Sequence, residues 1–192
     1  RLREGQKRSP EMARFLGEAM AWVAMGTVSD MMPLQDENRI LVKRGLRAIP
    51  LTTHAGLAAL CKIAGVDKQD FRAEDIAFKL APRLNAATRM GRTDVSLALL
   101  TSNDAAAAPG LAKQLDDLNK QRQAADRAMF DEIRNQLDDM PAEEPVIMRN
   151  DHWNAGLLGL VASRIVQQVG RPAALVSGKN GDPAKGSMRT VK

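Results

Sequence analysis

The chain has 192 residues, 44% of them hydrophobic and 27% charged, and this balance is ordinary for one large or two small globular domains. The single cysteine, Cys61, excludes an intrachain disulfide and a zinc site of several cysteines, and it indicates a reducing compartment. Aromatic residues are only 3% of the chain, which argues against a surface that binds single strands mainly by stacking bases on aromatic rings. No apolar run approaches the roughly 18 residues of a membrane span, so we expect a cytoplasmic protein.

The net charge of +5 is unevenly distributed. Residues 83–92 contain three arginines and no acid. The last 22 residues carry five basic side chains against Asp182 alone, namely Arg171, Lys179, Lys185, Arg189 and Lys192. Such clusters are typical of a phosphate-binding surface, although a solvated basic face accounts for the charge alone equally well.

Most of the first 100 residues show helical spacing of apolar side chains, interrupted by Gly and Pro. An apolar segment leads into a Gly/Ser/Pro-containing turn at Asp30, and His54 is expected at the surface in a loop. The expected elements are a helical and apolar stretch over 10–25, helices over 36–48, 57–64 and 67–80, an Arg-rich turn after Pro82, and a short helix through 97–100.

The clearest element is a helix over residues 110–138, where apolar residues recur at steps of three, four and seven. Such a helix of about 27 residues is roughly 40 Å long. It could join two lobes or simply pack as an ordinary helix. The apolar face consists of Leu111, Leu115, Leu118, Ala125, Met129, Ile133 and Leu137.

The pattern changes near residue 140, after the polar segment DDMPAEEP at 138–145. A strand over 146–148, a helix over 157–169, a strand over 173–177 and a last strand from Ala184 are expected. This alternation predicts an α/β domain in the last third of the chain.

Four segments carry the chemical signal. They are VAMGTVSDMMPLQDENR (23–39), KLAPRLNAATRMGR (79–92), WNAGLLGLVASRI (153–165) and KGSMRT (185–190). In this order, and together with LDDLNKQRQ at 115–123, they resemble the RecJ-type single-strand-specific DNA exonucleases of the DHH phosphoesterase family. The resemblance covers nearly the whole chain, and it implies an internal piece of a longer enzyme.

The resemblance implies an α/β fold with three parts. Residues 1–50 would be the C-terminal part of a DHH catalytic domain, and residues 51–140 a helical connector that contains the long helix. Residues 141–192 would be a truncated DHH-associated α/β domain. The family hydrolyses phosphodiesters with two Mn2+ or Mg2+ ions, which prefer oxygen ligands.

The resemblance also implies site residues. Asp30 holds the position of a metal ligand, and the other ligands, a DxD-type pair and the DHH triplet, would lie upstream of Arg1. Gly186, Ser187 and Arg189 would bind the 5′-terminal phosphate, because guanidinium binds phosphate bidentately and a small-residue turn admits an anion. Met188 stands where the family usually has Gly, and we expect its side chain to crowd this turn.

Further residues would line the path of the strand by contacts to its backbone, independent of sequence. The family pattern has Gly at Thr88 and commonly His at Asn154, and Gly156 and Gly159 are expected to permit close packing of a helix against the sheet or a ligand. Asn85 could instead stabilise its turn. The predicted DNA-contacting residues are Arg83, Asn85, Arg89, Arg122, Gln123 and Lys185.

The leading hypothesis is part of a 5′→3′ exonuclease that trims single-stranded DNA to mononucleotides in recombination and repair, with partner proteins from those pathways. Because one aspartate cannot hold two metal ions, the 192-residue chain by itself is expected to be inactive. Two alternatives stay open. One is a non-catalytic strand-binding relative, and the other is a DHH phosphodiesterase for short RNA or cyclic dinucleotides, although such enzymes typically carry a GGGH-like turn at KGSMR.

Overall fold

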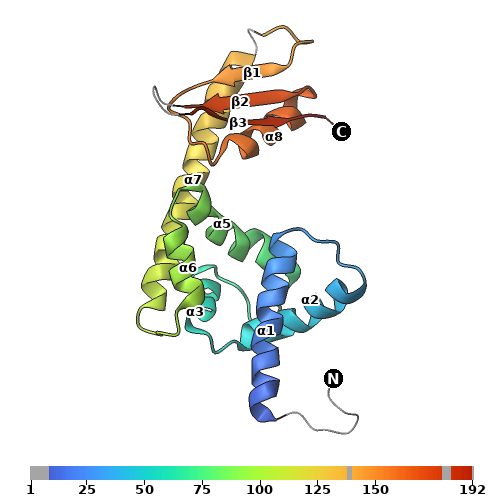
Figure 1. Ribbon diagram of the computed structural model, residues 1–192, viewed down its shortest axis with the longest axis vertical. Helices are drawn as coiled ribbons and strands as arrows, with labels where there is room; N and C mark the ends of the chain where they lie inside the picture. Colours follow the sequence, from blue (N-terminus) through green and yellow to red (C-terminus); the bar gives the residue numbers. More distant parts are fainter. Residues whose placement is uncertain (1–8, 138–139, 179–182, 192) are drawn as a thin grey trace. The chain divides into compact units, whose positions relative to one another are not determined.

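The computed structural model describes residues 9–137, 140–178 and 183–191 (Figure 1). The chain divides into two compact units. The first unit comprises Arg1–Asn85 and Asp94–Asp116, and the second comprises Ala86–Thr93 and Asp117–Lys192. The fold is mixed α/β, mostly helical with one small sheet, which confirms the predicted fold class. The domain boundaries near residues 50 and 140, which the resemblance to the family implies, remain predictions.

The first unit begins with the helix pair α1 (Pro10–Ser29) and α2 (Asp36–Ala48), which lie side by side in Figure 1. The Ser9 hydroxyl caps α1 by accepting from the Met12 N–H at 3.1 Å. Gly45 makes the close crossing possible, because a Cβ there would lie 2.3 Å from both the Met20 carbonyl oxygen and the Ala24 Cβ. The predicted helix over 36–48 is confirmed.

A short 3-10 turn, η1 (Ile49–Leu51), leads to α3 (Ala55–Ile63), and α6 (Thr93–Thr101) packs against α3. A Cβ on Gly56 would lie 1.8 Å from the Leu99 carbonyl oxygen, so this packing requires glycine. His54 caps α3, since its Nδ1 accepts from the Leu57 N–H at 3.2 Å, and its ring meets Trp22 edge-on. The predicted loop position of His54 is thus confirmed, but the residue is half-buried and makes these contacts, so it is not the freely exposed surface residue that was expected.

Residues 73–89 form one continuous helical stretch, built from α4 (Ala73–Asp75), the π-helical η2 (Ile76–Leu80) and α5 (Ala81–Arg89). The expected turn after Pro82 is wrong, and the preceding helix starts at Ala73 rather than near residue 67. Proline lacks an N–H and its ring clashes with the carbonyl four residues earlier in a regular α-helix. Here the Ala81 N–H bonds to the Ile76 carbonyl, and this wider turn lets the helix continue past proline.

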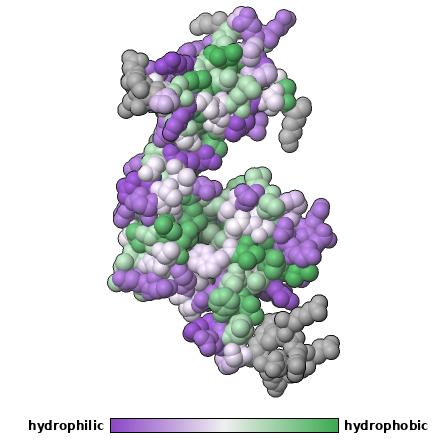
Figure 2. Space-filling view, viewed as in Figure 1, coloured by the Kyte–Doolittle hydropathy of each residue, from purple (hydrophilic) through white to green (hydrophobic). Residues whose placement is uncertain are grey.

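The surface of the first unit exposes several large apolar side chains. Figure 2 shows hydrophobic surface along α1, and the exposed fractions reach 63% for Phe15, 81% for Leu51 and 90% for Met31. Exposed apolar area of this kind is typical of a surface that contacts other protein. No helix in the described part of the chain combines the length and the apolar character needed to span a bilayer.

The long helix α7 (Ala108–Leu137) confirms the prediction over 110–138 to within two residues at each end. The second unit continues with β1 (Val146–Arg149), α8 (Leu158–Val169), β2 (Ala173–Ser177) and β3 (Lys185–Arg189), all as expected. The sheet order is β1-β2-β3, with β1 parallel and β3 antiparallel to β2.

The core of the second unit lies between α7, α8 and the sheet. Met129, Ile133 and Leu137 of α7 pack into it with the buried face of α8. Glu132 adds a polar anchor, because its carboxylate accepts from the Trp153 indole N–H at 2.9 Å and from the Asn150 amide at 2.7 Å. These contacts fix the segment between β1 and α8 on the long helix.

Candidate nucleic-acid interface

Ser187 and Arg189 lie on the face of the sheet that α8 covers. In the β2–β3 register, Ser187 is opposite Leu175 and Arg189 is opposite Ala173, and both β2 residues are fully buried. Side chains directly opposite each other in a sheet share a face. Lys185, opposite the buried Ser177, belongs to the same row and is itself exposed.

The two predicted phosphate-binding side chains contact each other at the start of α8. Arg189 Nη1 donates to the Ser187 hydroxyl at 2.9 Å and to the Met188 carbonyl at 2.7 Å. A Cβ added to Gly159 would lie 2.8 Å from Arg189 Nη2 and 3.0 Å from Ser187 Oγ. Gly159 is the second residue of α8, so the missing side chain leaves room for this pair at the positive end of the helix dipole.

Gly186 and Met188 belong to the other face of β3. Met188 is opposite Ala174 and 69% exposed, so it lies away from Ser187 and Arg189. The expected crowding by Met188 is therefore wrong, because alternate residues of a strand point to opposite faces. A Cβ on Gly186 would be 3.4 Å from Val176 Cγ2 on that same outer face.

Arg89, the last residue of α5, reaches the loop that precedes α8. Its Nη1 donates to the Gly156 carbonyl at 3.1 Å, and a Cβ on Gly156 would lie 2.3 Å from the Arg89 carbonyl oxygen. Asn154 shapes this loop by accepting from the Gly156 N–H at 2.8 Å, while its amide lies 3.6 Å from Met90 Sδ. Two arginines distant in sequence, Arg89 and Arg189, thus approach residues 156–159 of the second unit. The expected close approach of helix and sheet is confirmed at Gly159 of α8, whereas Gly156 lies in the preceding loop and allows the backbone of Arg89 to approach instead.

The other predicted DNA-contacting residues have different surroundings. Arg83 is held by several contacts, since Nε and Nη2 both lie 2.9 Å from Asp116 Oδ1 and Nη1 donates to the Lys79 carbonyl at 2.7 Å. Arg122 Nε donates to Asn119 at 3.3 Å along α7. Asn85 and Gln123 are exposed.

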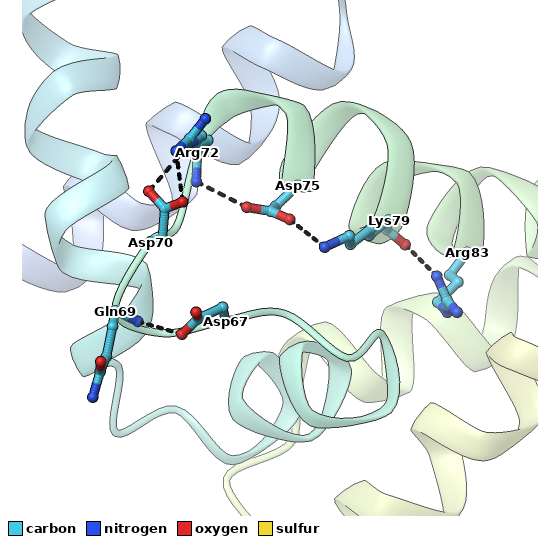
Figure 3. Close-up of polar contacts among 7 residues, drawn as sticks. All are labelled: Asp67, Gln69, Asp70, Arg72, Asp75, Lys79 and Arg83. Carbon is cyan, nitrogen blue, oxygen red and sulfur yellow. Dashed lines mark hydrogen bonds and ion pairs between the residues drawn. The ribbon is translucent and has the colours of Figure 1, made fainter.

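Arg83 ends a run of polar contacts along residues 67–83 of the first unit (Figure 3). Asp75 lies at the centre, where its carboxylate accepts from the Arg72 backbone N–H at 2.9 Å and pairs with Lys79 at 2.6 Å. Burial by itself would raise the pKa of Asp75, but these hydrogen bonds and the nearby positive charges outweigh it and hold the pKa below its ordinary value of 3.8. The side chain of Arg72 pairs in turn with Asp70 at 2.6 Å. Asp75 therefore stabilises the start of the helical stretch that carries Arg83.

Asp75→Ala is expected to lower the free energy of unfolding at pH 7 by about 1–3 kcal/mol, because it removes a buried acceptor of charged hydrogen bonds. A group with a lowered pKa stabilises the fold above the unfolded value and loses this effect as the pH falls through the folded pKa. Urea unfolding at pH 7 and pH 3 should therefore show a difference between variant and parent that shrinks at the lower pH. The exposed Glu74→Ala is the control, and equal effects of the two variants would contradict this role.

Asp30 directly follows α1 as its C-cap, where its N–H bonds to the Gly26 carbonyl at 3.0 Å and its side chain is exposed. Its carboxylate has the chemistry that Mn2+ or Mg2+ prefers. Across residues 9–137, 140–178 and 183–191, no group of three or more His, Cys, Asp or Glu side chains is placed to hold a metal ion.

Cys61 is 3% exposed on α3, and burial raises the pKa of its thiol to about 11. The thiolate, which is the reactive form, is therefore scarce at neutral pH. Cys61 is therefore an unreactive core residue.

No protein-family model matches the sequence. Single-stranded-DNA-specific exonuclease RecJ of Bacillus subtilis is 36% identical over 177 residues, which cover 91% of this chain and 22% of that protein. RecJ of Thermus thermophilus is 37% identical over 168 residues, and RecJ of Escherichia coli is 34% identical over 185 residues. These alignments cover 88% and 92% of this chain, but 24% and 32% of those proteins.

Solved structures agree with the sequence comparison. The crystal structure of RecJ from Thermus thermophilus in complex with Mg2+ aligns with a TM-score of 0.80 at 36% identity, over 91% of this chain and 27% of that one. A crystal structure of exonuclease RecJ bound to manganese aligns with a TM-score of 0.77 at 33% identity, over 100% of this chain and 51% of that one. The chain spans less than a third of the length of each of these three relatives. In sequence and in fold, the chain is therefore similar to one part of the RecJ exonucleases.

Proposed function

We propose that the chain is part of a metal-dependent 5′→3′ exonuclease that hydrolyses single-stranded DNA, and that its second unit holds the 5′-terminal phosphate. The observation that carries the proposal is the convergence of Ser187 and Arg189 on the side-chain-free Gly159 at the start of α8. A terminal phosphate presents two negative charges and several acceptor oxygens. The pair offers a planar cation, a hydroxyl and the positive end of a helix in return.

The same geometry would make binding of the strand independent of its base sequence. The guanidinium, the hydroxyl and the helix end all address a phosphate, which is identical for every base. Arg89, which approaches the turn before α8, would add positive charge to this region. Exposed Lys185, Asn85 and Gln123, with Arg122, would contact the phosphate backbone of the strand.

Arg83 has a different proposed role. Asp116 and the Lys79 carbonyl occupy its guanidinium, and its side chain is only 17% exposed. We expect it to act by holding α5 against the start of α7, rather than by contacting DNA.

Asp30 would supply one oxygen ligand to a Mn2+ or Mg2+ ion, and such ions lower the pKa of bound water and stabilise charge on phosphate oxygens. Because a single carboxylate does not hold two ions, we expect this chain alone to be without nuclease activity. The single cysteine, buried and free, supports a reducing, cytoplasmic location. Proteins of DNA repair and recombination would be its partners.

The proposal is tested by the binding of the 192-residue chain to one oligonucleotide that carries a 5′-phosphate, a 3′-phosphate or no terminal phosphate. We expect the 5′-phosphorylated strand to bind roughly 10- to 100-fold more tightly than the other two, since hydrogen bonds to charged groups contribute about 1.5–3 kcal/mol. Fluorescence anisotropy at several salt concentrations provides the measurement, and affinity should fall steeply as salt rises. Equal binding of the 5′- and 3′-phosphorylated strands would overturn the assignment, because the two carry the same charge.

A further inference from the structure

A groove of the second unit shares Arg189 with the proposed phosphate site. It has a volume of about 680 Å3 and lies between α8 and the end of β3. Ser163, Val166 and Gln167 form its α8 side, at spacings that place them on one face of the helix. Arg189, Thr190 and Val191 form the opposite side. Ligand pockets for small molecules have volumes of roughly 300–1,000 Å3, so the groove is large enough for a nucleoside.

Arg189 connects the groove with the proposed phosphate site. Its guanidinium contacts Ser187 beside Gly159, near the first turn of α8, and its side chain also lines the groove. The remaining α8 residues of the groove lie further toward the C-terminal end of that helix. A ligand whose phosphate is held at Ser187 and Arg189 therefore has this groove directly beside its next chemical group.

The lining of the groove suits an uncharged, flat group with a polar edge. Arg189 is the one charged side chain among the described residues that line it. Val191, which is 45% exposed, and the accessible edge of the largely buried Val166 offer apolar contact. The exposed Gln167 offers an amide that both donates and accepts hydrogen bonds. A second phosphate would find no further cation among these described residues, whereas the edge of any of the four bases presents donors or acceptors that an amide can meet.

We propose that this groove holds the base of the 5′-terminal nucleotide, with Gln167 bonded to the edge of the base and Val166 and Val191 against its face. This inference rests on the proposed function, because the phosphate at Ser187 and Arg189 places the base in the groove. The amide of Gln167 can rotate to present either its oxygen or its nitrogen, so the site would hold all four bases without selecting one. The terminal nucleotide would thus be gripped at both its phosphate and its base.

Gln167 and Gln168 form a matched pair for the test. They are adjacent, exposed and identical in type, but only Gln167 lines the groove. The variants Gln167→Ala and Gln168→Ala should be compared with the parent chain in binding two 5′-phosphorylated oligonucleotides. One carries a normal 5′-terminal nucleotide, and the other is abasic at that nucleotide alone.

The parent chain should bind the normal strand roughly 3- to 10-fold more tightly than the abasic strand, as expected for one or two hydrogen bonds with accompanying apolar contact. Gln167→Ala should lose most of this difference without changing its affinity for the abasic strand, and Gln168→Ala should behave like the parent. Equal binding of normal and abasic strands by the parent would overturn the base site, as would equal effects of the two variants. These results differ from failure of the proposed function, in which the parent would show no preference for a 5′-phosphate at all.

Discussion

Gly159→Ala is expected to abolish most of the preference for a 5′-phosphate while leaving the second unit folded. The added Cβ would lie 2.8 Å from Arg189 Nη2 and 3.0 Å from Ser187 Oγ, which are the groups proposed to bind the phosphate. Arg189 is exposed and Ser187 is half-buried, and both lie on the edge strand β3. The ends of these two side chains can therefore move aside at little cost to stability. Alanine also favours a helix more than glycine does, by up to about 1 kcal/mol.

The expected loss is roughly 10-fold or more in affinity for the 5′-phosphorylated strand, down to the level of the strand with a 5′-hydroxyl. The measurement is the ratio of the two dissociation constants, with circular dichroism to establish that the variant is folded. Gly110→Ala is the control, because a Cβ there meets nothing within 4 Å. A Gly159→Ala chain that keeps the full ratio would show that the phosphate is bound elsewhere.

Gly156→Ala is expected to destabilise the second unit by about 1–3 kcal/mol, the usual cost of adding a methyl group to a well-packed site. The added Cβ would lie 2.3 Å from the Arg89 carbonyl oxygen and 3.0 Å from the Arg89 Cα. These are backbone atoms at the end of α5, so a side-chain rotation does not relieve the overlap. Either the loop at 154–156 or the end of α5 must move.

Urea unfolding measures this effect in a Trp22→Phe background, which leaves Trp153 of the second unit as the single tryptophan. The midpoint of the Trp153 fluorescence transition should fall for Gly156→Ala. Gly159→Ala in the same background should change it little, since it meets flexible side-chain ends instead of backbone. An unchanged midpoint for Gly156→Ala would contradict the packing of Arg89 against this loop.

The elements that could be predicted are those whose signals lie within a few residues of one another. The helix over 36–48 matches α2 at both ends, and the apolar stripe of 110–138 matches α7 closely. The strand and helix pattern after residue 140 also holds. Periodicity, glycine and proline are local properties, and they act before any tertiary contact forms.

The predicted turn after Pro82 was wrong because the effect of a proline on a helix depends on the hydrogen-bond geometry of the preceding turn. A π-helical turn over Ile76–Leu80 accommodates the ring, and nothing in the sequence alone indicates it. The role of His54 was missed for a related reason. The Leu57 N–H is a local cap partner that the spacing could have suggested, whereas the packing against Trp22 is 32 positions distant and depends on the fold.

By itself, the sequence determined the helices and strands, the α/β class and the resemblance to RecJ-type exonucleases, because these depend on short patterns and on motifs in a recognisable order. Only the tertiary structure decided how individual side chains are used. It paired Arg83 with Asp116, turned Met188 away from Ser187, and brought Arg189 to Gly159. These contacts join residues up to 33 positions apart, and they depend on how helices and strands pack rather than on the identity of neighbouring residues.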